Sequence, residues 1–156
     1  MSKTNWVSIR NELKAELLSV PGIKIVHGFP RIVKDDTIVR WLKLMIDQSE
    51  INAWTILRES QQVEYLTGGD VFVGIDILLL GMLEHSESKN SQDVFDEVVD
   101  NVVEKFWKNF NLAGTVTIQG PAQIRLEELR QVADKVVHTA EVTIKARKRI
   151  YTGSSQ

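Results

Sequence analysis

One run, "GGDVFVGIDILLLGM" from Gly68 to Met82, is the most apolar stretch of the chain and carries a single carboxylate, Asp76, near its centre. Its two leading glycines and its many β-branched residues favour a buried strand over Val71–Gly81. The run is far shorter than the ~20 residues that a membrane-spanning helix needs, and a charge interrupts it. We therefore predict that this run forms the longest strand of a sheet and that the chain has no membrane span.

Alternation along this strand sorts its side chains into two rows on opposite sides of the sheet. One row is apolar throughout and consists of Val71, Val73, Ile75, Ile77 and Leu79. The other row contains Asp76 together with Phe72, Gly74, Leu78 and Leu80. Because Gly74 has no side chain and an unpaired buried carboxylate is costly, we expect the Asp76 row to be less completely covered. There Asp76 should meet a cation, a polar group or solvent, and a subunit boundary is one place that offers them.

Two segments have the spacing of three and four residues that is typical of amphipathic helices. The first is Asn5–Val20, which Pro21 and Gly22 end. The second is Ser91–Phe110, whose longest apolar stripe consists of Phe95, Val99, Val102 and Phe106. We predict that this stripe packs on the sheet.

Further strands are predicted from short alternating runs that lie between turn residues. They are Ile23–His27, Ile38–Ile46, Thr115–Gly120 ended by Pro121, and Val137–Arg147 with one buried and one wet face. Ala53–Glu59 fits either a strand or a short helical turn. Together the elements predict an α+β fold with a mostly antiparallel sheet packed against two main helices. We expect one domain over residues 1–150 and a flexible C-terminal tail over residues 151–156.

Composition excludes several classes of function. The chain has no cysteine, which rules out disulfides, thiolate catalysis and cysteine-based metal sites. With 19 basic and 21 acidic residues it has no global positive field for nucleic acid. Its three histidines, His27, His85 and His138, lack the spacing of metal ligands, and no glycine-rich phosphate loop occurs. We therefore expect no metal, no cofactor and no enzymatic activity.

Asp76 is the one residue whose position suggests chemistry. A carboxylate among apolar neighbours has a raised pKa and can serve as a general acid or base, but it needs a partner. No spacing links Asp76 to a histidine, so a structural role is the stronger interpretation. A small enzyme or ligand-binding protein that uses Asp76 and a histidine stays open as an alternative. Another is a nucleic-acid-binding module that uses the basic residues Lys145, Arg147, Lys148 and Arg149.

Surface contacts with other subunits offer a different role for these residues. The candidate interface residues are Asp76, Trp107, Lys145, Arg147 and Arg149. Trp107 is included because its helix is apolar nearly all round and has more to bury than one small sheet covers. Only three prolines occur and none lies inside a predicted strand, so the sheet edges are open to pairing.

Segments along nearly the whole chain, from about Trp6 to Arg147, resemble one protein family. They are "PGIKIVHG", "RWLKLMI", "DVFVGIDILLLG", "SQDVFDEVVDNVVEKF" and "VVHTAEVTIKAR". In this order they are similar to the tail terminator, or tail completion, proteins of long-tailed bacteriophages, whose layout related phage neck proteins share. The loops expected around Arg31–Asp36 and Ile51–Tyr65 match no particular contact of that family.

The resemblance implies a structural virion protein and no enzyme. Members of the family are α+β domains that form hexameric rings on the tail tube, end its polymerisation and present a surface to the head. The implied partners are further copies of the chain, the tail tube protein and a head–tail connector or neck protein. Genomic DNA would pass through the ring without sequence-specific binding. The implied location is the virion, and the host cytoplasm during assembly.

Overall fold

The computed structural model describes residues 6–29, 45–47, 50–66, 68–108, 110–112, 116–132 and 134–150. The N-terminal part contains α1 (Trp6–Leu18), β1 (Ile25–His27), β2 (Ile46–Asp47), β3 (Glu50–Tyr65) and β4 (Val71–Glu84). The C-terminal part contains α3 (Ser91–Lys105), β5 (Phe110–Leu112), β6 (Val116–Val132) and β7 (Lys135–Ile150).

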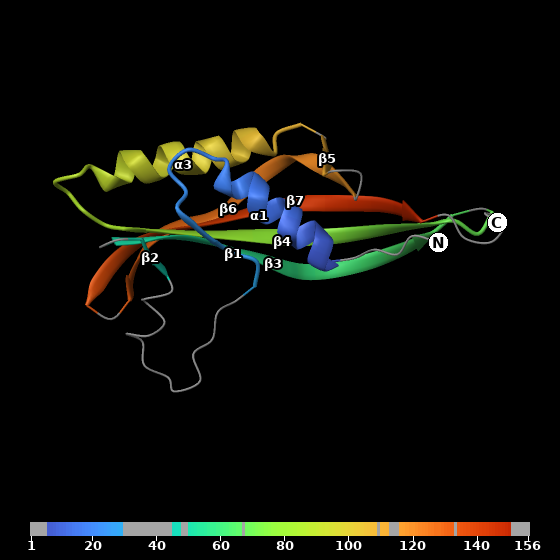
Figure 1. Ribbon diagram of the computed structural model, residues 1–156, viewed down its shortest axis with the longest axis horizontal. Coiled ribbons are helices and arrows are strands. Elements are labelled where there is room, and N and C mark those ends of the chain that lie inside the picture. The colour runs from blue at the N-terminus through green and yellow to red at the C-terminus, as the bar shows by residue number, and fades with distance from the viewer. Residues whose placement is uncertain are drawn as a thin grey trace.

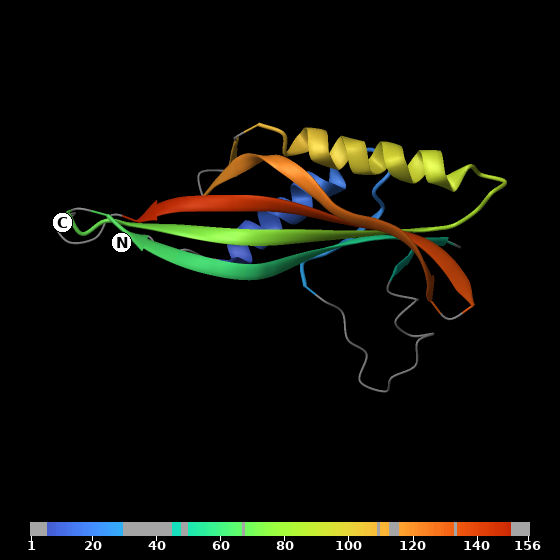
Figure 2. The same cartoon turned by 180° about the vertical axis from the view of Figure 1, so that it is seen from behind.

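The seven strands form one sheet in the order β1-β3-β4-β7-β6-β5, with β2 beside β3. Helices α1 and α3 both cover one face of this sheet, which we call the helix face, and the opposite side is the open face (Figure 1). The hairpin of β6 and β7 curls away from the helices at one end (Figure 2). The sheet is therefore curled and covered by helices on one side.

The predicted fold class, α+β with a mostly antiparallel sheet packed against two main helices, is wrong. Of the described residues, 58% lie in strands and 24% in helices, so the chain is mostly β. The sheet is mixed, because β1 runs parallel to β3 while the other pairs are antiparallel. The strand content was underestimated because β3 and β6 continue through polar residues and β6 also passes through Gly120 and Pro121.

The main core lies between the helices and the helix face. The apolar row of β4 is buried there at Val73, Ile75, Ile77 and Leu79, as its alternation predicted. The α3 stripe is confirmed, because Phe95, Val99, Val102 and Phe106 are all buried in the same core. From α1, the buried residues are Ile9, Leu13 and Leu17.

Trp54 is the largest fully buried side chain in this core and explains one glycine. It pairs with Gly81 on the neighbouring strand, and a Cβ at position 81 would lie 2.4 Å from the indole ring. A side chain at position 81 would therefore displace Trp54. On the side facing α3 the indole stacks on Phe95, with ring centroids 6.5 Å apart.

The other predicted strands have different outcomes. Val137–Arg147 lies in β7 with its buried and wet faces as expected, and Ala53–Glu59 lies in the strand β3. The predicted strand over Ile23–His27 is shorter, since β1 begins at Ile25. Most of the predicted strand Ile38–Ile46 lies outside the described residues, as do Arg31–Asp36 and the expected tail over residues 151–156. Two expectations are wrong: β6, with 17 residues, is longer than β4, and the segment expected as a loop over Ile51–Tyr65 is strand.

Three strands continue beyond the helices as a narrow ribbon, which we call the arm (Figures 1 and 2). The arm consists of residues 63–65 of β3, 71–73 of β4 and 148–150 of β7, which lie beyond the last pairing of β7 with β6 at Arg147. A turn closes its tip, where the Leu66 N–H donates to the Asp70 carbonyl at 2.8 Å. Tyr65 at the tip is 81% exposed, so the arm carries a large side chain into solvent.

Candidate functional site

Asp76 lies at the middle of the open face and accepts two hydrogen bonds from β3. The Ser60 hydroxyl donates to its Oδ2 at 2.6 Å, and the Gln62 amide donates to the same oxygen at 3.2 Å. Lys145 is the directly paired residue on β7 and lies on the same face. Asp76 therefore contacts polar groups on the less covered side of its strand, as we expected, and has a cation at the paired position of β7.

The same contacts keep Asp76 in its charged form. The hydrogen bonds from Ser60 and then Gln62 lower the pKa of this carboxyl; burial opposes them to a smaller extent, and the charge of Lys145 adds the smallest effect, which again lowers the pKa. A general acid at neutral pH needs a raised pKa. The shift therefore runs opposite to the one that an acid–base role for Asp76 requires.

Arg147 and Arg149 lie at the base and tip of the arm, where each forms an ion pair with a carboxylate. Arg147 approaches Glu64 at 3.5 Å and stacks 3.6 Å above the centre of the Phe72 ring. Arg149 pairs with Asp70 at 2.8 Å. The structure thus places Lys145, Arg147 and Arg149 on the open face with Asp76. Both guanidinium groups form ion pairs within the chain.

A polar hollow of about 460 Å³ crosses the open face beside Asp76. Its walls come from β3, β4, β6 and β7 and include Glu59, Lys145 and Gln119. Close by, Arg125 of β6 reaches over the two central strands to Glu59 of β3 at 2.7 Å. Acidic and basic groups therefore alternate across this face instead of converging on one point.

Trp107, the remaining predicted interface residue, lies away from this group. It follows α3 on the helix side, and its carbonyl oxygen would lie 2.1 Å from a Cβ at position 120. The next contact of this turn is a backbone hydrogen bond from Ala122 N–H to the Phe106 carbonyl at 3.1 Å. The Trp107 side chain itself is 56% exposed, which keeps it available for a partner.

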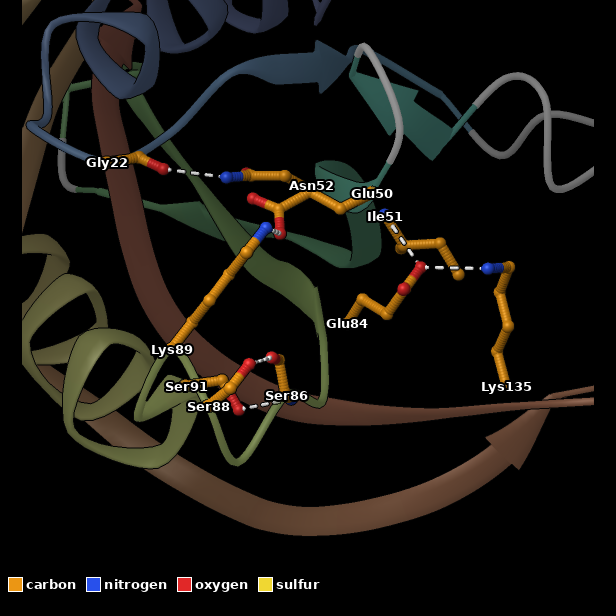
Figure 3. Close-up of polar contacts among 10 residues, drawn as sticks. All are labelled: Gly22, Glu50, Ile51, Asn52, Glu84, Ser86, Ser88, Lys89, Ser91 and Lys135. Carbon is orange, nitrogen blue, oxygen red and sulfur yellow. Dashed lines mark hydrogen bonds and ion pairs between the residues drawn. The ribbon is translucent and has the colours of Figure 1, made fainter.

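Polar contacts hold the opposite end of the sheet, where β4 leads into α3 (Figure 3). Glu84 accepts from Lys135 at 3.2 Å and from the Ile51 N–H at 3.3 Å. In the following turn the Ser86 N–H donates to the Ser91 hydroxyl at 2.8 Å, and Lys89 reaches Glu50 at 3.5 Å. These contacts tie the start of α3 to β3 and β7.

Nothing in the spacing of the histidines along the chain predicted that two of them meet at this junction. The Ser91 hydroxyl lies 2.8 Å from Nε2 of His138, and His85 Nδ1 lies 3.3 Å from the same nitrogen. His138 is 2% exposed and stacks on Phe95. Burial and the neighbouring His85 lower the pKa of His138, so its neutral form is favoured. Only the pairing of β4 with β7 brings these residues together, and no local spacing reveals it.

This cluster contains a serine beside a histidine, as hydrolase sites do, but its arrangement does not suit catalysis. The Ser91 oxygen is buried and accepts a hydrogen bond from the Ser86 N–H, and the histidine tautomer sets which of Ser91 and His138 donates in their contact. Asp76 cannot complete such a site, because it lies seven positions along β4 from Leu83, the partner of His138, and on the other face. Within the described residues, no three histidine, aspartate or glutamate side chains gather closely enough to hold a metal ion.

Two long stretches of strand backbone have a partner on one side only. The β3 edge, Arg58–Tyr65, pairs with β4, and no other strand of the described part of the chain covers its outer side. The β6 edge, Ile124–Arg130, pairs with β7 and is likewise uncovered by the described strands, since β5 reaches only to Ile118. Because unpaired strand edges are templates for further pairing, both are candidate contact surfaces.

Comparison with known proteins adds no relative, since neither a protein-family model nor a curated protein matches the chain. Neither helix of the described residues is long and apolar enough to cross a membrane.

Proposed function

We propose that this protein is a structural virion component that assembles as a ring, as tail terminator proteins of long-tailed bacteriophages do. The ring, a hexamer in that family, caps the tail tube, ends its polymerisation and offers a surface to a head connector or neck protein. Genomic DNA passes through it without sequence-specific contact. The protein acts in the virion after assembly in the host cytoplasm.

The observation that carries this proposal is the pair of open strand edges on opposite sides of the sheet. A ring requires two different surfaces on each subunit, because each copy meets one neighbour with one patch and the next neighbour with another. The β3 edge and the β6 edge supply two such surfaces. The arm adds an exposed extension from one of them.

The two alternatives from other functional classes have less support. An enzyme or ligand-binding site built from Asp76 and a histidine lacks the required proximity, as described above. A nucleic-acid-binding surface needs free cations, whereas Arg147 and Arg149 pair with Glu64 and Asp70. Another head–tail connector or neck protein is the nearest alternative, since it also assembles from copies of one chain.

The experiment combines mass measurement with a binding assay. Light scattering of the purified protein should give a mass of several subunits, and negative-stain images should show rings. Mixed with purified tail tubes, the rings should bind the tube ends and stop further growth. A particle that stays monomeric at high concentration and in the presence of tubes contradicts the proposal, whereas rings that ignore tubes indicate the neck-protein alternative.

A further inference from the structure

We propose that the β3 edge of one copy pairs antiparallel with the β6 edge of the next, with Arg58 placed beside Asp96, Asp100 and Glu127. This inference rests on the proposed self-assembly and specifies the surfaces that perform it. The partner at each edge is therefore a second copy of this chain.

Strand direction supports this pairing. β3 is antiparallel to β4, β4 to β7, and β7 to β6, so β3 and β6 run in opposite directions. When two copies lie side by side with their helix faces on the same side, the β3 edge of one meets the β6 edge of the other in antiparallel orientation. The sheet then continues from copy to copy in its own alternating pattern, which satisfies backbone groups on both edges.

The side chains along both edges suit contact with another chain. On the β6 edge the exposed apolar residues are Ile124, Leu126 and Leu129. On the β3 edge they are Val63 and Tyr65. Pairing would remove these apolar groups from water, which favours association.

On the helix face, the β6 edge and the β3 edge carry opposite charges. Glu127 of β6 lies near Asp96 and Asp100 of α3, and burial followed by these two like charges raises the pKa of Glu127. None of the ion pairs among the described residues includes these three carboxylates. On the β3 edge, Arg58 is exposed and stacks on Trp6 of α1, so it lies on the helix face too. Side-by-side pairing in this orientation brings the cation toward the acidic group.

Irregularities in both edges favour a specific partner. The register of β3 shifts between Arg58 and Ser60, and that of β6 shifts between Ile124 and Leu126. Bulges and edge charges prevent indiscriminate pairing, because a regular strand cannot align with them. The same bulges and edge charges that discourage aggregation would therefore make the pairing of two copies selective.

Cross-linking tests the contact directly, and the cysteine-free chain is well suited to it. We choose Gln61→Cys on β3 and Ile124→Cys on β6, because both side chains are exposed and face the helix side. In an antiparallel register that places Arg58 opposite Glu127, position 61 lies opposite position 124 once the bulge in each strand is counted. Within one copy these positions are about 19 Å apart, since they are offset by four residues along the strands and separated by three inter-strand spacings. A short bismaleimide should therefore join them only between copies.

The double variant should give a ladder of dimers, trimers and larger products in the assembled protein. Each single variant should stay uncross-linked, because β3 meets β6 and not another β3. The matched control combines Gln61→Cys with Glu97→Cys, an exposed position on α3 away from the β6 edge. A dimer from either single variant, or no ladder from the double variant, overturns the proposed pairing.

Charge reversal tests the role of Arg58. Arg58→Glu should weaken assembly about tenfold in sedimentation, the loss expected for one charge pair at an interface. Adding Glu127→Arg to that variant should restore assembly, whereas Arg58→Lys should leave it nearly unchanged. Thermal unfolding of the dilute protein reports whether each variant folds. A double variant as weak as Arg58→Glu alone refutes the contact with the acidic group.

These outcomes separate the pairing from the proposed function. Rings that cap tail tubes without the predicted cross-links mean that the function stands and the interface lies elsewhere. Cross-linked rings that bind no tubes mean that the interface stands and the terminator role fails.

Discussion

Alternation along β4 determines on which face of the sheet the carboxylate of Asp76 lies. The two rows of β4 predicted that Asp76 would lie on the less covered side, and the structure places it there. Its hydrogen-bond donors, Ser60 and Gln62, could not be predicted, because the register of β3 against β4 is not readable from either strand alone.

Replacing Asp76 by Asn should lower the free energy of unfolding by roughly 0.5–1 kcal/mol at neutral pH, because bonds to a charged acceptor are stronger than bonds to a neutral one. The modest figure reflects partial exposure of the site. The folded state lowers the pKa of Asp76 below its ordinary 3.8, so the stabilisation is present above that pH and is lost below it. Urea unfolding at pH 7 and at about pH 3 should show a difference that shrinks on acidification. A constant difference would mean that charge is not its cause.

His138 predicts a second pH dependence. The folded protein favours neutral His138, whereas the unfolded chain takes up a proton near the ordinary pKa of 6.5. Stability should therefore fall as the pH drops below about 6.5. His138→Gln, whose amide can still hydrogen-bond to Ser91, should be less stable at every pH but should show a smaller fall between pH 7.5 and 5.5. An unchanged slope in thermal unfolding would assign the pH dependence to other groups.

Among the elements, α3 is the one whose packing was most accurately predicted from its sequence. Its stripe was predicted from spacing alone and is buried, because a long amphipathic helix carries its own packing information. Strand β6 was predicted least accurately, since it was expected to end at Gly120. A Gly-Pro pair usually ends a strand, but here Gly120 lets the backbone of Trp107 approach closely and the strand continues to Val132. That approach depends on where α3 ends in space, which no local signal encodes.

The end of α3 offers a matched pair of substitutions. Phe106→Ala should cost about 3–5 kcal/mol of unfolding free energy, because the side chain is 0% exposed and leaves a cavity. Trp107→Ala, one residue later, should change stability by less than about 0.5 kcal/mol, because the indole is largely in solvent. Denaturant unfolding measures both. Comparable losses in the two variants would show that the stripe does not anchor the helix.

For the whole molecule, the two open edges follow from the strand order and were invisible in the sequence. The chain predicted a sheet with unblunted edges, but the identity of those edges depends on β4 pairing with β7. Residues far apart in the chain make that pairing, from Val71 with Ile150 to Glu84 with Val137. Sequence patterns report local periodicity, so they could predict strands and faces but neither the order of strands nor the parallel β1.

Hydrogen exchange should reveal the edges in solution. In dilute, unassembled protein the outward amides of Arg58–Tyr65 and Ile124–Arg130 should exchange rapidly, since no described strand covers them. At concentrations where the protein assembles, both sets should become protected together. The amides between β4 and β7 serve as the reference and should exchange slowly in both states. Protection of only one edge would indicate that the two do not meet each other.

The pairing of β4 with β7 also sets the order in which this molecule can fold. β3 and β4 are neighbours in the chain and can close early as a hairpin, but the second side of β4 must wait for a strand that begins at Lys135. Contacts between such distant segments close slowly, on the order of milliseconds to seconds in β-rich domains. During that interval the most apolar run of the chain is exposed along one edge, where another molecule can bind it. Refolding yield should therefore fall with protein concentration, although in the native state β4 is paired with a strand on each side.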